Sequence, residues 1–343
     1  MRPLLLMAAA IGLVGCGGNT NQQAFNTFDF AGGNPDLAGT NIDPNADMTD
    51  TSNNGGADMT GSSGGACTSY TKSTIAAMRM AKTSGCFEID NVVTVATSPQ
   101  TASSKSIRII AQDPAGGDYS GIVVTCYSTS AKHPCTVLPT AGAIIAGRSI
   151  TVMGYYVNGG YESMSIDSVT DNGSGTPPAP ASLVLTDVER GAMTTAKWFQ
   201  KVTLTIAAAD QLKMFDFFPP EFQPSSQSGT CTHVYGFGMI PKSASGAPGP
   251  ACSGTTMQPA GMTAINNAEV LFGTDYYGGF TANSQCTCIS SKTMKPYPGL
   301  LSAGSTLSGK VSAILFYDQF SGPGYQYLSP LTNADAPITG LSM

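Results

Sequence analysis

The segment that decides the fold of this chain reads Ile109-Ile110-Ala111-Gln112-Asp113-Pro114-Ala115-Gly116-Gly117-Asp118-Tyr119-Ser120-Gly121-Ile122-Val123-Val124. An apolar run, a turn rich in Pro and Gly, and a second apolar run are typical of a β-hairpin. Pro114 fixes its own φ, and Gly116 and Gly117 supply positive φ without a steric penalty. The side chain of Asp113 is expected to cap this turn. We therefore predict two antiparallel strands at this point.

Apolar and polar residues alternate on both sides of the hairpin as well. This period of two predicts short strands over residues 92–96, 106–111, 121–126, 148–158, 162–169, 182–188 and 201–206. One helix over residues 73–82 is predicted before them, with Ser73 as its cap and Ile75, Met78 and Ala81 facing inward. The 40 glycines and 22 prolines argue against long helices. The composition predicts an all-β barrel or sandwich.

The N-terminus has the pattern of an export signal. Arg2 precedes an apolar run over residues 4–14, which ends at Leu13-Val14-Gly15-Cys16. This run is too short for a membrane-spanning helix, which needs about 20 residues, so we predict a signal peptide over residues 1–15. The pattern resembles the lipobox of bacterial lipoproteins, which implies that Cys16 is lipidated and anchors an exported protein. Gly17 after the cysteine resembles the sorting pattern for the outer membrane of Gram-negative cells.

Residues 16–66 differ in composition from the rest of the chain. Asn, Gly, Thr, Ser and Asp dominate, so we predict a disordered tether after the lipidated cysteine. The chain has 16 Lys and Arg and 22 Asp and Glu, of which Arg2 and six tether aspartates precede residue 67. The remaining body thus has 15 basic and 16 acidic side chains. Such a balance argues against non-specific nucleic-acid binding.

Eight cysteines remain when Cys16 is set aside. An even number in an exported chain predicts disulfides, although eight cysteines allow 105 pairings. The spacing predicts two local bridges and two longer ones: Cys67–Cys86, Cys126–Cys135, and Cys231 and Cys252 with Cys286 and Cys288 in either order. The alternative for part of this set is a zinc site of Cys231, His233, Cys286 and Cys288. Export favours the disulfides over the metal.

Several motifs resemble one known family. They are the Gln112-Asp113-Pro114 turn with its two glycines, Gly147-Arg148-Ser149-Ile150-Thr151-Val152-Met153-Gly154, Asp171-Asn172-Gly173-Ser174-Gly175-Thr176-Pro177-Pro178, and Trp198 with Val202. They are similar to the OB-fold-like domains that accompany secreted bacterial nucleases and phosphoesterases. The resemblance implies an OB-like Greek-key barrel over residues 67–206 that follows the short helix.

A weaker resemblance extends into residues 207–343. Its motifs are Leu307-Ser308-Gly309-Lys310-Val311 and Leu328-Ser329-Pro330-Leu331-Thr332-Asn333-Ala334-Asp335, and it implies a second OB-like domain in tandem. An insertion over residues 215–262 is expected to be pinned by disulfides. We expect no nuclease or phosphoesterase domain after this unit, and so expect the resemblance to carry the fold and not the activity.

Residues that could bind a ligand are few. A candidate ligand face combines three aromatic and two basic residues, Tyr155, Tyr156, Tyr161, Arg108 and Arg148. The alternative is that these rings fill the barrel interior. Asp113 and Asp118 could hold a calcium ion across the turn, but a turn residue and a solvated carboxylate explain them more simply. His133, one of two histidines, is expected in an exposed turn.

We therefore expect a non-catalytic envelope lipoprotein that binds a protein, a glycan or a small ligand, or that has a structural role. No cofactor or metal is predicted, and the membrane is the expected partner through the lipid anchor. The alternative is a nucleic-acid-binding accessory protein, which would be favoured if its basic residues shared one face: Arg108, Lys132, Arg148, Lys197 and Lys201. A hydrolase is the third class, but the sequence has no convincing catalytic set for it.

Overall fold

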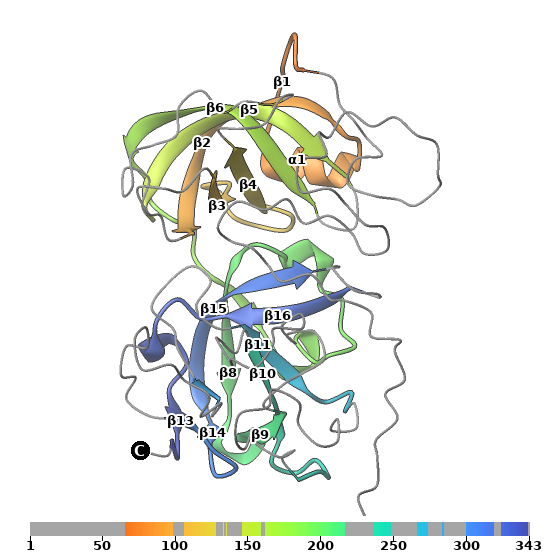
Figure 1. Ribbon diagram of the computed structural model, residues 1–343, viewed down its shortest axis with the longest axis vertical. Helices are drawn as coiled ribbons and strands as arrows, with labels where there is room; N and C mark the ends of the chain where they lie inside the picture. The colour runs from red at the N-terminus through yellow and green to blue at the C-terminus, as the bar shows by residue number, and fades with distance from the viewer. Residues whose placement is uncertain are drawn as a thin grey trace, which may run out of the picture.

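The computed structural model describes residues 66–98, 106–127, 133, 135, 146–158, 162–216, 236–247, 266–273, 283–284, 300–318 and 324–341. Two β units follow each other along the long axis of the molecule (Figure 1). Strands dominate these residues, which contain one α-helix, α1 (Ile75–Ala81). Within the described ranges, no helix has the length and apolarity needed to cross a membrane. The predicted all-β fold class is confirmed.

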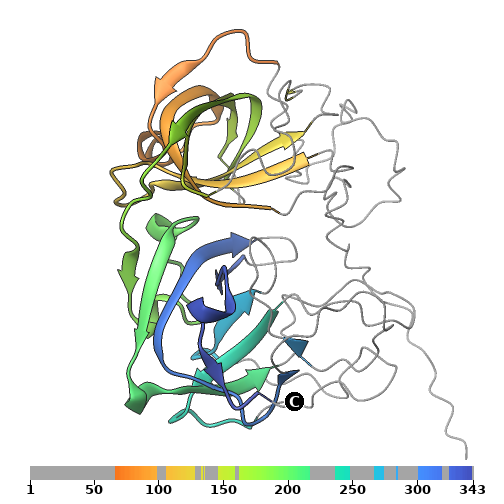
Figure 2. The ribbon, with the colours of Figure 1, turned by 90° about the vertical axis from the view of Figure 1, so that its left-hand side faces the viewer.

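The first unit is a closed barrel of five strands. They are β2 (Gly85–Thr97), β3 (Ser106–Gln112), β4 (Gly121–Tyr127), β5 (Arg148–Val157) and β6 (Ser163–Ser174). Their order is β2-β3-β4-β6-β5, and pairing of β5 with β2 closes the ring (Figure 2). The β4–β6 pair is parallel and the other four pairs are antiparallel. Because β5 returns to lie beside β2, the first four strands form the Greek key expected of an OB-like barrel.

The predicted hairpin is confirmed as the β3–β4 pair. Its register places Gln112 opposite Gly121, and the turn contains Gly116 and Gly117 at φ values of 66° and 91°. The turn is closed by a backbone hydrogen bond of 2.9 Å from the amide of Gly116 to the carbonyl of Asp113. The side chain of Asp113 leaves the turn, so the prediction that it caps the hairpin was wrong.

Successive side chains of β3 and β4 alternate between the two faces of the sheet, and both faces are apolar. Ile109 and Val124 belong to the cluster inside the first barrel, whereas their neighbours Ile110 and Val123 belong to a second cluster that fills the other unit. Helix α1 contributes Ile75 and Met78 to the interior of the first barrel, as predicted. The side chains of β3 and β4 are therefore buried on both faces of the sheet, a pattern more common in the central layer of a protein.

Helix α1 differs from the prediction in two details. Its cap is Thr74, which accepts a hydrogen bond from the amide of Ala77 at 3.1 Å, because Ser73 already belongs to β1 (Thr71–Ser73). The inward position near its end is taken by Arg79, and Ala81 is exposed. The helix ends at Lys82, which has a left-handed backbone.

The second unit repeats the strand order of the first. Its main strands are β8 (Lys201–Ile206), β9 (Leu212–Asp216), β10 (Gly236–Pro241), β11 (Val270–Gly273), β15 (Gly309–Asp318) and β16 (Tyr325–Ser329). The order β9-β10-β11-β16-β15-β8 matches the first barrel when β8 and β9, joined through the 3₁₀ turn η3 (Ala208–Asp210), together replace β2. The parallel β11–β16 pair corresponds to the parallel β4–β6 pair. The described strands thus support a second OB-like barrel.

Short elements complete the two units. The edges of the second sheet are formed by β7 (Ala181–Leu183), β14 (Thr306–Leu307) and β17 (Ile338–Thr339), while β12 (Asn283–Ser284) pairs with β13 (Leu300–Leu301). Three further 3₁₀ turns are η1 (Leu185–Asp187), η2 (Thr195–Lys197) and η5 (Asn333–Asp335). The predicted strand over 182–188 was wrong beyond Leu183, because the Asp187 carboxylate accepts a 2.9 Å hydrogen bond from the amide of Val184 and favours a turn.

The two local disulfides are confirmed. Cys67 pairs with Cys86, and Cys126 pairs with Cys135, with Cα separations of 5.8 and 5.3 Å. The first bridge clips the segment before β1 to the start of β2, and the second ties residue 135 to β4. The other predicted sites lie outside the described residues: Cys16, Tyr161, Lys132, and the disulfide or zinc candidates Cys231, His233, Cys252, Cys286 and Cys288.

Candidate functional site

OB-fold proteins commonly bind ligands on the face that corresponds to the outer face of β3 and β4. Here that face is covered. Ile110 and Val123 are both fully buried and belong to the same apolar cluster as Phe199, at the start of the second barrel. A Cβ atom placed on Gly121 would lie only 2.2 Å from the carbonyl oxygen of Phe199. The second barrel therefore packs directly against this face, and glycine is needed at the contact.

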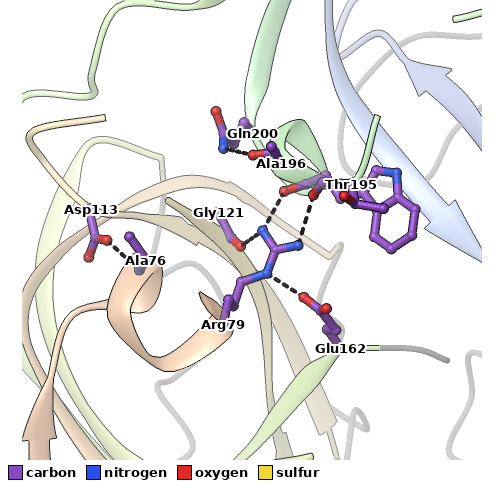
Figure 3. A network of polar contacts seen from close by, with 9 residues as sticks. Ala76, Arg79, Asp113, Gly121, Glu162, Thr195, Ala196 and Gln200 are labelled. Atoms are coloured by element: carbon purple, nitrogen blue, oxygen red, sulfur yellow. Dashed lines mark hydrogen bonds and ion pairs between the residues drawn. The ribbon is translucent and has the colours of Figure 1, made fainter. Parts of the chain in front are cut away.

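A buried arginine connects the two barrels at this contact (Figure 3). Arg79 extends from α1 with a fully buried side chain, and its guanidinium forms an ion pair with the carboxylate of Glu162. The other guanidinium nitrogens donate to three backbone carbonyls, those of Gly121 at 2.9 Å, Thr195 at 3.1 Å and Trp198 at 3.2 Å. One side chain thereby holds β4 of the first barrel and the η2 segment before the second.

Two aromatic rings contact the same guanidinium. The centroids of Tyr119 and Phe199 lie 5.5 and 5.7 Å from the central carbon of Arg79, within the usual range for cation–π contacts. Further hydrogen bonds run from the amide of Lys201 to the side-chain oxygen of Gln112 at 2.9 Å, and from the amide of Tyr119 to the carbonyl of Ala196 at 2.6 Å. The junction therefore joins the two barrels through polar as well as apolar contacts.

The two aspartates of the hairpin turn have separate partners. The Asp113 carboxylate accepts hydrogen bonds from the amides of Ile75 at 3.0 Å and Ala76 at 2.9 Å, at the start of α1. Burial raises the pKa of this carboxyl, and the two amide donors act in the opposite direction. Asp118 instead pairs with Lys197. These separate partners give no support to a calcium site across the turn.

The residues of the predicted ligand face do not share one surface. Tyr155 and Tyr156 are neighbours in β5 and point to opposite sides of the sheet. Tyr156 is fully buried inside the first barrel, where burial raises the pKa of its hydroxyl, so its placement on a ligand face was wrong. Arg148 pairs with Asp171 at 2.7 Å, while Arg108 alternates with interior residues of β3 and so points outward. The alternative interpretation, that a ring fills the interior, holds for Tyr156.

A polar cluster lies beside the two disulfides. His133 Nδ1 is 2.9 Å from Oδ1 of Asp167 on β6, and Tyr70 donates its hydroxyl proton to Oδ2 of the same carboxylate at 2.8 Å. Burial, together with the bond to Asp167, raises the pKa of Tyr70 to about 12. The imidazole stacks on Tyr155 with 5.6 Å between ring centroids. His133 is only 8% exposed, so the expectation of an exposed turn residue was wrong.

The position of His133 follows from the second disulfide. It lies two residues before Cys135, whose bridge to Cys126 brings this segment back to the first barrel. No local motif marks Tyr70 and Asp167, so neither is recognisable as a site residue from the sequence. Arg79 was not recognised either, although it lies four residues after Ile75 and therefore on the same face of α1.

Comparison with known proteins adds no relative. No protein-family model matches the chain, and no curated protein matches it. What can be inferred about the function rests on the residues and contacts described above.

Proposed function

We propose that this chain is a non-catalytic envelope lipoprotein whose two-barrel body has a binding or structural role. In this proposal Cys16 carries the lipid, residues 16–66 form a tether, and the body stands away from the outer membrane. The partner is an envelope protein, a glycan or a small ligand.

The observation that carries the proposal is the junction between the barrels. The apolar cluster around Phe199 includes residues of both units, and Arg79 adds a buried polar connection. Such a contact favours one rigid body over two independently moving domains. The face of the first barrel that OB-folds commonly use for ligands contributes to this junction. In this protein that face therefore holds the two barrels together.

The polar side chains of the first barrel support the same proposal. Glu162 neutralises Arg79, and His133 hydrogen-bonds to Asp167. Each of these groups, which could serve chemistry elsewhere, has a structural partner here. The disulfides Cys67–Cys86 and Cys126–Cys135 fit an oxidising compartment and so favour export.

The lipid anchor can be tested with a single substitution. Cells that express the wild-type chain or Cys16→Ser are grown with a clickable palmitate analogue, and the chain is recovered by immunoprecipitation. We expect label on the wild-type chain only, with the variant left as a precursor or cleaved elsewhere. Equal label on both chains would refute the anchor, whereas lipidation with membrane fractionation to the outer membrane supports it.

The role of the body is tested by pull-down from native envelope with residues 67–343. A binding role predicts recovery of a defined envelope component that survives salt washes. The matched control is the Gly121→Ala variant, which should disturb the junction and reduce the yield if the rigid two-barrel form is the binding form. Equal recovery of the component by the unsubstituted body and by Gly121→Ala would show that binding does not depend on the junction between the barrels.

A nucleic-acid-binding accessory protein is the second candidate, and the repeated OB-type strand order favours it. The near-neutral charge of the body opposes it, because few counterions would be released on binding. We expect the body to bind single-stranded DNA no more tightly than about 100 μM near physiological salt. Fluorescence anisotropy measures this. Low-micromolar affinity that falls steeply with added salt would favour the second candidate over the first.

A further inference from the structure

We propose that Cys67, His133 and Asp167 form a zinc site that becomes available when the Cys67–Cys86 disulfide is reduced. One ligand atom from each residue lies within 4.8 Å of the other two. Thiolate, imidazole and carboxylate are all common ligands of zinc. Among the described residues, this is the set of His, Cys and acidic side chains with such a geometry.

The distances suit a single tetrahedral ion. Zinc bonds of roughly 2.0–2.3 Å place neighbouring ligand atoms about 3.3–3.6 Å apart. Nδ1 of His133 and Oδ1 of Asp167 are 2.9 Å apart and need to separate by a few tenths of an ångström, while the Cys67 sulfur, within 4.8 Å of the other ligand atoms, must close to about 3.6 Å once its bridge has opened. Three protein ligands leave the fourth position for water or a small anion.

Each ligand is held by contacts other than the bridge that must open. His133 is fixed by the second disulfide, Cys126–Cys135, and by stacking on Tyr155. Asp167 is part of β6 and accepts the hydroxyl of Tyr70. Tyr70 lies three residues after Cys67, and β1, which follows it directly, pairs with β2. Cys67 therefore stays near His133 and Asp167 after its own bridge is reduced.

The chemistry needs a dithiol reductant. A thiolate of the dithiol attacks one sulfur of the Cys67–Cys86 bridge, and its second thiol resolves the mixed disulfide, so two electrons pass to the protein and the dithiol leaves as a disulfide. Cys67 and Cys86 are then free thiols. Zinc binding displaces the proton of the Cys67 thiol to solvent, and the neutral imidazole and the carboxylate complete the protein ligands. Cys86 remains in β2 opposite Tyr155.

The site is thus coupled to the redox state of its surroundings. In the oxidised protein, Cys67 shares its electron pair in the S–S bond and offers no thiolate to a metal. Reduction by a dithiol creates the ligand. Zinc then opposes reoxidation, because the thiolate must leave the metal before the bridge can form again.

Two single substitutions separate this site from the other cysteines. In a full chain that carries Cys16→Ser, Cys86→Ser leaves Cys67 as a thiol without any reductant, and Cys67→Ser leaves Cys86 instead. Both variants lose the same disulfide and keep the others, so they form a matched pair. Intrinsic fluorescence of Trp198 checks that both are folded.

Zinc affinity is measured by competition with a chromophoric chelator, and cobalt(II) is used as an optical probe. We expect Cys86→Ser to bind one zinc ion at least about 100-fold more tightly than Cys67→Ser, since even the loss of an outer partner of a ligand commonly weakens binding 10–100-fold. Cobalt should give a thiolate charge-transfer band with Cys86→Ser alone. Adding Asp167→Asn to Cys86→Ser should weaken zinc binding while the carbonyl oxygen of the amide still accepts from Tyr70.

Equal zinc affinity in the two variants, or the absence of the cobalt band in Cys86→Ser, would overturn the proposal. If serine at position 86 impairs folding, Cys86→Ala repeats the measurement with a side chain that needs no hydrogen-bond partner. Failure of the zinc site leaves the lipid anchor and the binding role untouched, because neither depends on it.

Discussion

Replacement of Arg79 by methionine tests the junction most directly. Methionine keeps much of the length and volume of the side chain but removes the charge and all its donors. The substitution leaves the Glu162 carboxylate without its counterion and deprives three carbonyls of a donor, those of Gly121, Thr195 and Trp198. It also removes the cation that lies over the rings of Tyr119 and Phe199.

The magnitude follows from this loss. Removal of one partner from a buried ion pair commonly costs about 3–5 kcal/mol, and each buried carbonyl left without any donor adds about 1–3 kcal/mol before relaxation. The Thr195 carbonyl keeps one donor, the amide of Trp198 at 3.3 Å. The terms are not additive because they share one site, so we expect Arg79→Met to lower the free energy of unfolding by about 3–5 kcal/mol. The double variant Arg79→Met/Glu162→Gln removes the stranded charge and should recover at least about 1 kcal/mol of it.

Trp198 reports on the same place. It is the single tryptophan of the chain, its carbonyl accepts from Arg79, and its ring stacks on Tyr317 at 3.8 Å. Urea unfolding followed by tryptophan fluorescence should show a midpoint lower by about 1–2.5 M in the variant, for a slope of about 2–3 kcal/mol per molar. A loss below about 1 kcal/mol with unchanged emission would refute the idea that Arg79 holds the barrels together.

Three further outcomes are expected. Gly121→Ala should destabilise the junction and change Trp198 emission, since its Cβ would meet backbone at 2.2 Å, whereas Gly191→Ala, which has open space, should unfold like the wild type; equal unfolding of the two variants would contradict the packing described. The Arg148 guanidinium lowers the pKa of the Asp171 carboxyl below 3.8 in the folded protein. The ion pair therefore stabilises the fold at pH values above the pKa of this carboxyl in the unfolded chain, and this stabilisation is lost as the pH falls through its lower pKa in the folded protein. NMR titration of Asp171 should show the lowered pKa, and Arg148→Met should return that pKa towards 3.8. An unchanged pKa in the variant would contradict the effect of the Arg148–Asp171 ion pair. Non-reducing peptide mapping should find the two described bridges and two more that join cysteines across the insertion: Cys231 and Cys252 with Cys286 and Cys288. A bridge between the last two would contradict that pairing.

Local patterns predicted much of the fold. The hairpin around Pro114 was recognisable because its turn residues and alternating strands lie within one short segment. The Cys67–Cys86 and Cys126–Cys135 bridges were equally accessible, since each pair flanks a single element or loop. In these cases the decisive contacts join residues that are near in sequence.

The site depended on contacts that the sequence does not display. Arg79 meets Glu162 and Trp198 only after the barrel has closed and the second unit has packed against it. Turn chemistry predicted that Asp113 caps the hairpin, yet its carboxylate accepts hydrogen bonds from two amides at the start of α1 instead. Tyr155 and Tyr156 share a sequence motif, but the pleat of β5 sends them to opposite faces. Long-range packing decided each of these outcomes.

The Cys67–Cys86 bridge also determines how the body would respond to mechanical load. In a chain anchored through Cys16, as proposed, tension between the membrane and the body enters near residue 66. The covalent link passes this force directly to β2, so β1 and α1 lie outside the loaded path. Because β2 pairs with β3 and β5 along its length, force along the strand must shear many hydrogen bonds at once. The bridge therefore places the pulling point at the start of β2, the strand whose pairing with β5 closes the first barrel.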